Sequence, residues 1–381
     1  MAASPLIDLY IHRGLSFSSG DGVYLMTAEG DRYLDLMTNY GVDILGHGHP
    51  VVTRALVDQV GRLPSLHGSF GHRGRIAAAR ALAQRVPPGD GHVAWCNSGA
   101  EAVEAALKFA VLATGKRHFV ACEGGYHGKT LGALSATHGG RYREPFEPLL
   151  WRFDHVPFGD AAALEAALDE STAGLVIEPI QGEGGVVVPP PGYLRAARDL
   201  CAQRGVLLIL DEVQTGCGRT GAFTAAAGEG VAGDITCLGK GLAGGVPAGA
   251  TVVSPAISAA IPRSAHSSTL GGNPLACAGA AAVLSCVDDD MLARVTRLGA
   301  MFRERLGRIR HDRIAQVRGR GLMVGVQMRG ARDEVLKGLQ RERVLALPAG
   351  ADVVRFLPPY VVEPEHLERA AAALETVLEA L

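Results

Sequence analysis

The stretch VLLILDEVQTG (206–216) decides the fold of this chain. Its aliphatic run ends in an acidic pair at Asp211, which predicts a short buried strand over 206–212. Similar runs follow the same pattern elsewhere: HVAWC (92–96), HFVAC (118–122), AGLVIEP (173–179), DITCLG (234–239) and GATVVS (249–254). Helix-like stretches at 50–62, 74–86, 98–113 and 191–204 separate many of them. Short strands that alternate with helices predict an α/β domain with a largely parallel sheet.

The pattern changes toward both ends of the chain. The first 45 residues contain short alternating runs, DGVYLMTAEG and DRYLDLMT, which predict strands joined by a turn. From about residue 275, the long helical stretches LACAGAAAVLSCV and MLARVTRLGAMFRERLGRI precede GLMVGVQM, VVRFLPPYVV and a final amphipathic helix over 364–380. We therefore expect three parts: an N-terminal segment (1–45) that packs with the small domain, a large domain (46–280) and a smaller α+β domain (281–381).

Composition narrows the class of protein. The net charge of −2 over 381 residues gives no global bias toward nucleic acid or membranes. No apolar run is long enough to span a bilayer, and the N-terminus has no visible signal peptide. The seven cysteines form no CxxC pair, which is typical of reduced thiols in a cytoplasmic protein.

Ligands bind at the carboxyl ends of the strands in such a sheet, so chemistry is expected in the loops that follow them. In CNSGAEAVEAALKFA (96–110), Ser98 and Glu101 have the spacing of a capping box. Ser98, Gly99 and Ala100 would also leave backbone N–H groups free to bind a phosphate at a helix N-terminus. An ordinary helix cap is the simpler interpretation of this motif alone.

Two further loops carry charged side chains. Asp211 at the end of an apolar strand is costly unless it holds a cationic ring nitrogen, holds a metal or caps the next segment. Lys240 in DITCLGKGLAGG (234–245) lies among glycines, where an amine can have a lowered pKa and act as a nucleophile. A flexible surface lysine is the alternative.

Two other motifs are weaker. GCGRTG (216–221) matches the dinucleotide fingerprint G-x-G-x-x-G, but five residues separate it from the strand and no good helix follows. His47 and His49 share a turn-like stretch and lack the further ligands that a zinc site needs. We therefore predict neither NAD nor a metal.

Together, a phosphate site, a strand-end carboxylate and a lysine are the groups that anchor pyridoxal 5′-phosphate (PLP). The sequence also resembles the class III (omega) aminotransferases of PLP fold type I, especially those that act on acetylornithine, ornithine and putrescine. The resemblance runs from about residue 20 to 365 and rests on six motifs: CNSGAEAVEAALK, YHGKTLGALSAT, EPIQGEGGV, LDEVQTGCGRTG, GKGLAGGVPAGA and STLGGNPLACA. It implies a large domain with a mostly parallel, seven-stranded sheet and a smaller α+β C-terminal domain.

The resemblance also implies roles for particular residues. Lys240 would bind PLP covalently and then move the proton, while Asp211 would pair with the protonated ring nitrogen. Val213 and Tyr126 would lie on the two ring faces, and Gln214 near the ring oxygen. The other implied cofactor contacts come from Ser98, Gly99, Ala100, His127 and Glu178. Thr269 would reach the phosphate of the neighbouring subunit, with Ser268 beside it facing the substrate, so the enzyme would be a homodimer with active sites at the subunit interface.

Three positions bear on the substrates. In the family, an arginine like Arg355 binds the α-carboxylate of glutamate and otherwise pairs with a glutamate like Glu183. Acetylornithine, ornithine and GABA transaminases typically have arginine where this chain has Lys129, and the two side chains are not interchangeable. The chain has only five lysines, so a lysine at this position needs an explanation. Lys129 would favour a diamine or omega-amino donor and could still bind the distal carboxylate of 2-oxoglutarate.

The predicted activity is a ping-pong transfer of a terminal amino group from a diamine or omega-amino acid to 2-oxoglutarate, giving glutamate. Three alternatives stay open at this point. One is a PLP-dependent mutase of the same fold, of the glutamate-1-semialdehyde type. The others are an NAD-dependent oxidoreductase and a catalytically silent relative that only binds ligands.

Overall fold

A seven-stranded sheet forms the centre of the protein, for which a computed structural model describes residues 5–148 and 151–381. The strand order is β4-β10-β9-β8-β7-β5-β6. β10 runs antiparallel to both of its neighbours, while β9, β8, β7, β5 and β6 are parallel to one another. The bounds are β4 (His92–Cys96), β5 (His118–Cys122), β6 (Arg152–Val156), β7 (Thr172–Ile177), β8 (Leu207–Asp211), β9 (Ile235–Leu238) and β10 (Gly249–Val253).

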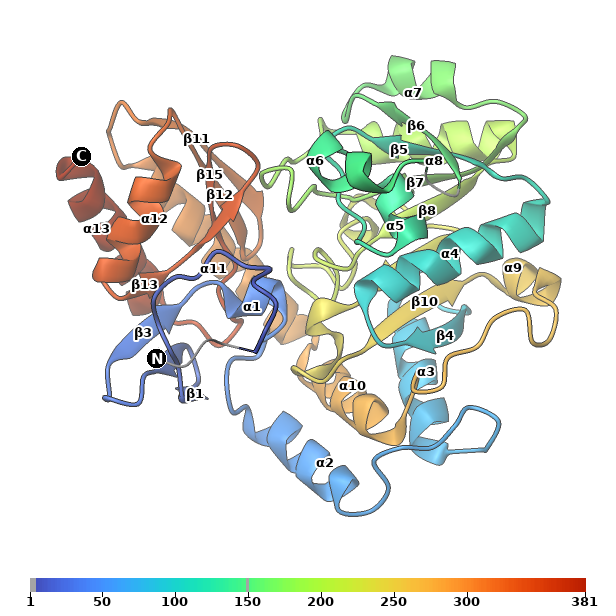
Figure 1. Ribbon diagram of the computed structural model, residues 1–381, viewed down its shortest axis with the longest axis horizontal. Coiled ribbons are helices and arrows are strands. Elements are labelled where there is room, and N and C mark those ends of the chain that lie inside the picture. The colour runs from blue at the N-terminus through green and yellow to red at the C-terminus, as the bar shows by residue number, and fades with distance from the viewer. Residues whose placement is uncertain (1–4, 149–150) are drawn as a thin grey trace.

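Helices cover both faces of this sheet (Figure 1). Apolar side chains of α4 pack against strands of the sheet in one buried cluster, and those of α8 pack in a second cluster that includes Leu208 and Leu210. The helices of this part are α2 (Pro50–Val60), α3 (Arg73–Arg85), α4 (Gly99–Thr114), α5 (Leu131–Ala136), α6 (Gly140–Arg143), α7 (Ala161–Ala167), α8 (Tyr193–Arg204), α9 (Pro255–Ala260) and α10 (Pro274–Cys286).

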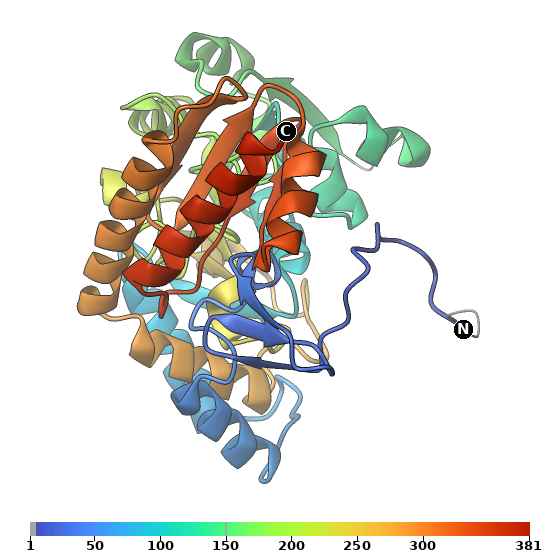
Figure 2. The same ribbon diagram turned by 90° about the vertical axis from the view of Figure 1, so that its left-hand side faces the viewer.

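The C-terminal part has its own antiparallel sheet, in the order β11-β12-β15-β14. Its elements are α11 (Asp289–Gly307), β11 (Ile314–Arg320), β12 (Met323–Met328), α12 (Arg332–Arg341), β13 (Val344–Leu345), β14 (Leu347–Ala349), β15 (Val353–Phe356) and α13 (Pro364–Glu379). Figure 2 shows α11, α12 and α13 against this sheet.

The N-terminal segment joins the C-terminal part through a shared sheet. β1 (Ser19–Asp21), β2 (Tyr24–Met26) and β3 (Arg32–Asp35) form a meander, and β13 pairs in parallel with β3 through Val344 and Leu34. The short α1 (Thr38–Gly41) follows, and its first three residues have positive φ angles. The N-terminal segment and the C-terminal part therefore share one four-stranded sheet, in the order β1-β2-β3-β13.

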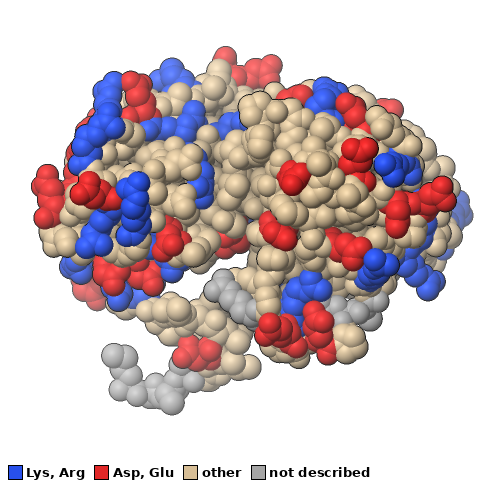
Figure 3. All heavy atoms as spheres, turned by 90° about the horizontal axis from the view of Figure 1, so that it is seen from above, with Lys and Arg blue, Asp and Glu red and all other residues tan. Residues whose placement is uncertain are grey.

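Basic and acidic side chains are interspersed over the face in Figure 3. Among the described residues, no helix is long and apolar enough to cross a membrane. All seven cysteines are free thiols.

Candidate active site

One cavity of about 340 Å³ gathers most of the predicted site residues. It lies where the loops after β4, β5, β7, β8 and β9 meet, at the carboxyl ends of these strands. Its lining consists of Gly99, Ala100, Tyr126, His127, Gly128, Lys129, Glu178, Glu183, Asp211, Val213, Gln214 and Lys240. Gly128 is the lining residue that the sequence analysis did not identify.

Lys240 enters the cavity from a tight turn after β9. It begins a 3₁₀ turn (Lys240–Ala243) with φ of +42°, in the left-handed region that a residue with a Cβ rarely adopts. Such strain persists only where the surrounding structure enforces it, and it is concentrated at functional sites. Burial lowers the pKa of Lys240 below its ordinary value, which increases the fraction of neutral, nucleophilic amine.

The side chain of Asp211, at the end of β8, is fixed by two contacts. Its Oδ2 lies 2.7 Å from Nδ1 of His127, and its Oδ1 accepts a hydrogen bond from the backbone N–H of Val213 at 3.0 Å. Burial alone would lower the pKa of His127, but its hydrogen bond to Asp211 and the nearby charge outweigh burial and raise it. The imidazole of His127 therefore lies directly against the side chain of Asp211 inside the protein.

Glu178 connects two walls of the cavity. Its carboxylate accepts hydrogen bonds from the N–H of Tyr126 at 2.9 Å and of Gly182 at 3.0 Å. Burial is the largest cause that raises the pKa of Glu178, to about 7. Its main geometric effect is to fix the loop that carries Tyr126 and His127 against the loop that carries Glu183.

The N-terminus of α4 faces the same cavity. Ser98 Oγ caps the helix by accepting from the N–H of Glu101 at 3.2 Å. The predicted capping box is only half correct, because the Glu101 carboxylate accepts from the N–H of Asn97 instead of that of Ser98. The first N–H groups of a helix have no intrahelical acceptor, so those of Gly99 and Ala100 are available at the cavity wall.

These residues fit PLP on the observations of this structure. A Cβ on Gly99 would lie 2.5 Å from Val213 Cγ1, and one on Gly128 would lie 2.7 Å from the Cβ of Ala100. Glycine at both positions therefore brings two loops close to the helix N-terminus, where a phosphate binds. A buried carboxylate and a lysine with lowered pKa lie in the same cavity, as the ring nitrogen and the aldehyde carbon of PLP require.

Arg355 reaches the site from β15 of the C-terminal part. Its side chain is fully buried, forms a 2.7 Å ion pair with Glu183 and donates to Oε1 of Gln214 at 2.9 Å. Burial would raise the pKa of Glu183, but the charges of Arg355 and Lys240 lower it below its ordinary value. The guanidinium also lies 5.6 Å from the ring centroid of Tyr40, a neighbour that no sequence pattern predicted.

Lys129 lies at the mouth of the cavity and is exposed. Its Nζ is 5.3 Å from the centroid of the Tyr142 ring, and Tyr142 in turn makes an edge contact with Tyr126. The two lysines therefore occupy different parts of the cavity. Lys240 lies deep in the cavity, and Lys129 lies near its entrance.

Ser268 and Thr269 do not line this cavity in their own chain. Ser268 Oγ accepts from Asn97 Nδ2 at 3.1 Å, and Thr269 is exposed. Their predicted contacts lie across a subunit interface, so they stay a prediction.

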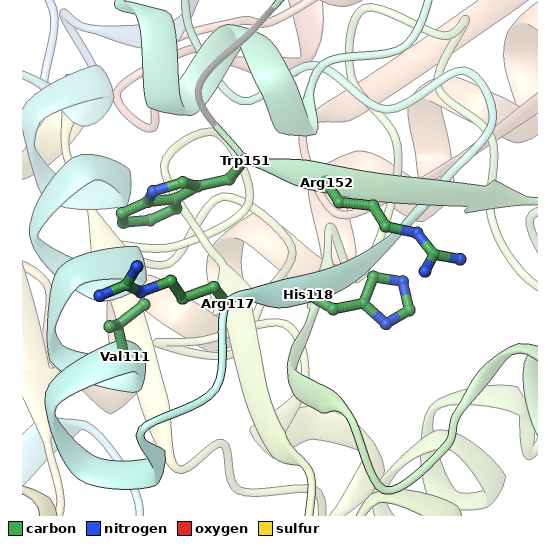
Figure 4. Close-up of a pocket in the computed structure, with 5 residues that line it drawn as sticks. All are labelled: Val111, Arg117, His118, Trp151 and Arg152. Carbon is green, nitrogen blue, oxygen red and sulfur yellow. The ribbon is translucent and has the colours of Figure 1, made fainter.

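A second cavity of about 510 Å³ contains none of the predicted residues. Its lining comes from α4, β5 and β6 near the starts of these strands, away from the loops of the site; Figure 4 shows Val111, Arg117, His118, Trp151 and Arg152. His118 and Arg152 both bond to Asp154, at 2.9 Å each. Among the described residues no group of His, Cys, Asp and Glu could hold a metal ion.

The fold and this site define a PLP-dependent enzyme of the α/β class. Comparison with known proteins makes the family definite: the class-III aminotransferase model matches residues 11–378, and the chain belongs to that family. It is therefore a PLP-dependent aminotransferase, and the dinucleotide interpretation of GCGRTG is wrong.

The similar proteins are aminotransferases as well. The acetylornithine aminotransferase of Methanopyrus kandleri is 44% identical over 100% of both chains. That of Mycolicibacterium smegmatis is 41% identical over 96% of this chain and 94% of its own. A solved structure of the ornithine aminotransferase from Toxoplasma gondii superposes with a TM-score of 0.94 at 35% identity, covering 99% of this chain and 92% of that one. Transamination of a terminal amino group follows from this membership.

Proposed function

We propose that this enzyme transfers the terminal amino group of a diamine or omega-amino acid, of the putrescine, acetylornithine or ornithine type, to 2-oxoglutarate by a ping-pong mechanism. The observation that supports this most directly is the ion pair between the buried Arg355 and Glu183, beside Lys240 and Asp211 in one site. We further propose a cytoplasmic homodimer, in which Ser268 and Thr269 complete the partner's site.

The chemistry divides among groups of this chain. PLP, when bound, supplies an electron-accepting ring next to the carbon that carries the amine. Lys240 binds the cofactor and, once released, moves the proton at the reacting carbon. Asp211, held in place by its hydrogen bond to His127, would pair with the ring nitrogen. Ser98, Gly99 and Ala100 would hold the phosphate, Gln214 would lie near the ring oxygen, and Val213 and Tyr126 would lie on the two ring faces.

Arg355 and Glu183 address the need to accept two different substrates in one site. While an amine donor without a nearby carboxylate is bound, the ion pair neutralises the guanidinium. When the oxo acid enters, Glu183 gives way and the guanidinium binds its α-carboxylate through two parallel hydrogen bonds.

Arg355→Lys is accordingly expected to raise the KM for 2-oxoglutarate at least about tenfold, because a hydrogen bond to a charged group contributes about 1.5–3 kcal/mol. Steady-state kinetics with 2-oxoglutarate and pyruvate measures this, since both carry the α-carboxylate. Butanal, an acceptor without a carboxylate, is the control and should lose much less. An equal loss for all three acceptors would contradict carboxylate binding by Arg355.

Lys129→Arg tests the choice of donor. Arginine offers a planar fork where lysine offers one point charge, so we expect kcat/KM for acetylornithine to rise about fivefold relative to putrescine. The ratio is measured with the two donors at a fixed 2-oxoglutarate concentration. Lys337→Ala on the exposed face of α12 is a matched control lysine. Unchanged turnover of both donors in Lys129→Arg would show that Lys129 does not determine specificity.

A donor screen tests the proposed function itself. Purified holoenzyme is offered putrescine, acetylornithine, ornithine and related omega-amines with 2-oxoglutarate, and glutamate formation is followed. Amine transfer that proceeds without any added oxo acid would instead indicate a mutase of the same fold. Absence of glutamate with every donor would contradict 2-oxoglutarate as the acceptor.

A further inference from the structure

The GCGRTG loop (216–221) places a fully buried arginine between the two halves of the chain. Arg219 Nη1 donates to the carbonyl oxygen of Leu322 at 3.0 Å and to that of Pro358 by a shorter bond. No ion pair involves Arg219 among the described residues, and burial lowers its pKa. A buried cation without a carboxylate is costly, so a specific contact must be gained in return.

The two carbonyls lie at the end of a strand ladder. β12 and β15 are antiparallel, with Val324 opposite Phe356 and Gly325 opposite Arg355. Continuing that register places Leu322 opposite Pro358. Proline has no N–H, so it cannot donate to the carbonyl across from it. The guanidinium supplies the missing donor and joins the two strand ends, three residues from Arg355.

The glycines of the loop have a conformational purpose that differs from phosphate binding. Gly218 and Gly221 both have φ of +91°, and a Cβ on Gly218 would meet Leu292 and Val287 at 2.8 and 2.9 Å. The backbone carbonyl of Arg219 also accepts from the N–H of Leu322 at 3.1 Å. The loop is therefore hydrogen-bonded to the start of β12 through both the backbone and the side chain of Arg219.

The segment that follows Arg355 depends on the rest of the protein for its position. Leu357 N–H donates to Leu36 at 2.7 Å, and Leu357 C=O accepts from Thr38 Oγ1 at 2.8 Å. The hydroxyl of Tyr360 donates to the carbonyl of Cys217, in the GCGRTG loop, at 2.9 Å. The ring of Tyr360 also lies 5.0 Å from the guanidinium of Arg219. The position of residues 357–360 thus depends on hydrogen bonds to residues outside the β11-β12-β15-β14 sheet.

We propose that Arg219 is a positioning residue for substrate binding: it locks the end of the β12–β15 ladder to the large domain and so fixes where the Arg355 guanidinium meets the carboxylate of the oxo acid. This inference rests on the proposed function, since it takes Arg355 as the carboxylate-binding residue. It assigns the GCGRTG motif a function in aligning the two parts of the site.

The test measures binding of glutarate, an unreactive dicarboxylate with the carbon skeleton of 2-oxoglutarate, to the holoenzyme by calorimetry. Arg219→Met removes the donors, and we expect the Kd to rise about tenfold, since small displacements of a binding group are costly. Arg219→Lys keeps a donor and a charge at this position, and we expect partial rescue, to about threefold. Tyr360→Phe, which removes one hydroxyl, should raise the Kd about threefold and remains informative if Arg219→Met does not fold.

Arg294→Met is the matched control. Arg294 donates to the carbonyls of Tyr360 at 3.0 Å and Val362 at 2.6 Å, so it holds the same region from α11 within the C-terminal part. We expect this variant to unfold at lower denaturant concentration while the Kd for glutarate stays unchanged. An equal rise in Kd for Arg294→Met would show general loosening and overturn the proposal.

The remaining outcomes distinguish a failure of the Arg355 assignment from a failure of the role proposed for Arg219. If Arg355→Lys leaves the Kd for glutarate unchanged, the assignment of Arg355 under the proposed function fails, and the role of Arg219 fails with it. If Arg355→Lys raises the Kd while Arg219→Met and Tyr360→Phe both leave it unchanged, the role of Arg219 alone is overturned.

Discussion

Lys240→Ala is expected to lower kcat by at least about 10³-fold, because a positioned acid–base group contributes about 10²- to 10⁴-fold and this residue also binds the cofactor. Lys240 lies in the same cavity as Asp211 and its burial lowers its pKa. Near neutral pH the amine is therefore more often unprotonated than an ordinary lysine, as a nucleophile and base must be. The measurement is single-turnover conversion of the best donor from the screen.

A second measurement separates the chemistry from folding. Borohydride reduction followed by peptide mass analysis should find PLP attached at Lys240 in the wild-type protein and nowhere in the variant. Lys129→Ala, which removes an amine from the cavity mouth, should retain the covalent label. Turnover within tenfold of wild type in Lys240→Ala would contradict the assignment of Lys240.

The sheet was predictable because its central strands are buried on both faces. HFVAC (118–122) matches the fully buried β5 residue for residue. HVAWC (92–96) matches β4 equally well, because this edge strand keeps a continuous apolar run although it is only partly buried. β6 was missed, because RFDHV in this edge strand mixes charged and apolar residues and lacks the continuous apolar run. α7 and α12 were missed as well; the predicted helical stretches did not include the short, alanine-rich Ala161–Ala167 or the strongly charged start of α12.

The site was predictable in part for a topological reason. Parallel strands end at the same edge of a sheet, so residues as far apart in sequence as Ala100 and Lys240 could be expected to meet. The pairing of Arg355 with Glu183 could not be derived this way, since it joins β15 of another sheet to a loop of the large domain. It came from the family resemblance.

Other features depend on three-dimensional packing that no local pattern encodes. The contact between His127 and Asp211 joins residues 84 positions apart. The left-handed backbone of Lys240 is enforced by its surroundings. GCGRTG is a sequence match that the structure does not support as a phosphate site. Its glycines match a phosphate-binding pattern by spacing alone. Their contacts instead place a buried arginine at the junction of two sheets.

Asp211→Asn is expected to lower kcat by about 10²- to 10³-fold, the range for removing one preorganised electrostatic group from an active site. Asparagine keeps the shape and can still accept from the N–H of Val213, so folding should change little. The carboxylate that would face the ring nitrogen is lost, and His127 loses the partner whose hydrogen bond and charge raise its pKa. The pKa of His127 should therefore fall, which NMR titration of the imidazole can detect independently of activity.

Glu178→Gln is the control variant against which the loss of activity in Asp211→Asn is compared. Both carboxylates line the cavity, but the pKa of Glu178 is raised to about 7, so near neutral pH it is already partly protonated. Glutamine can keep at least one of the two backbone contacts, to Tyr126 or Gly182, and we expect a loss of about tenfold or less in kcat. If the two variants lose activity equally, the site requires both carboxylates as charges, and the specific pairing of Asp211 with the ring nitrogen is contradicted. A large loss confined to Asp211→Asn is what a single buried carboxylate, positioned by His127 and directed at one atom of the cofactor, should produce.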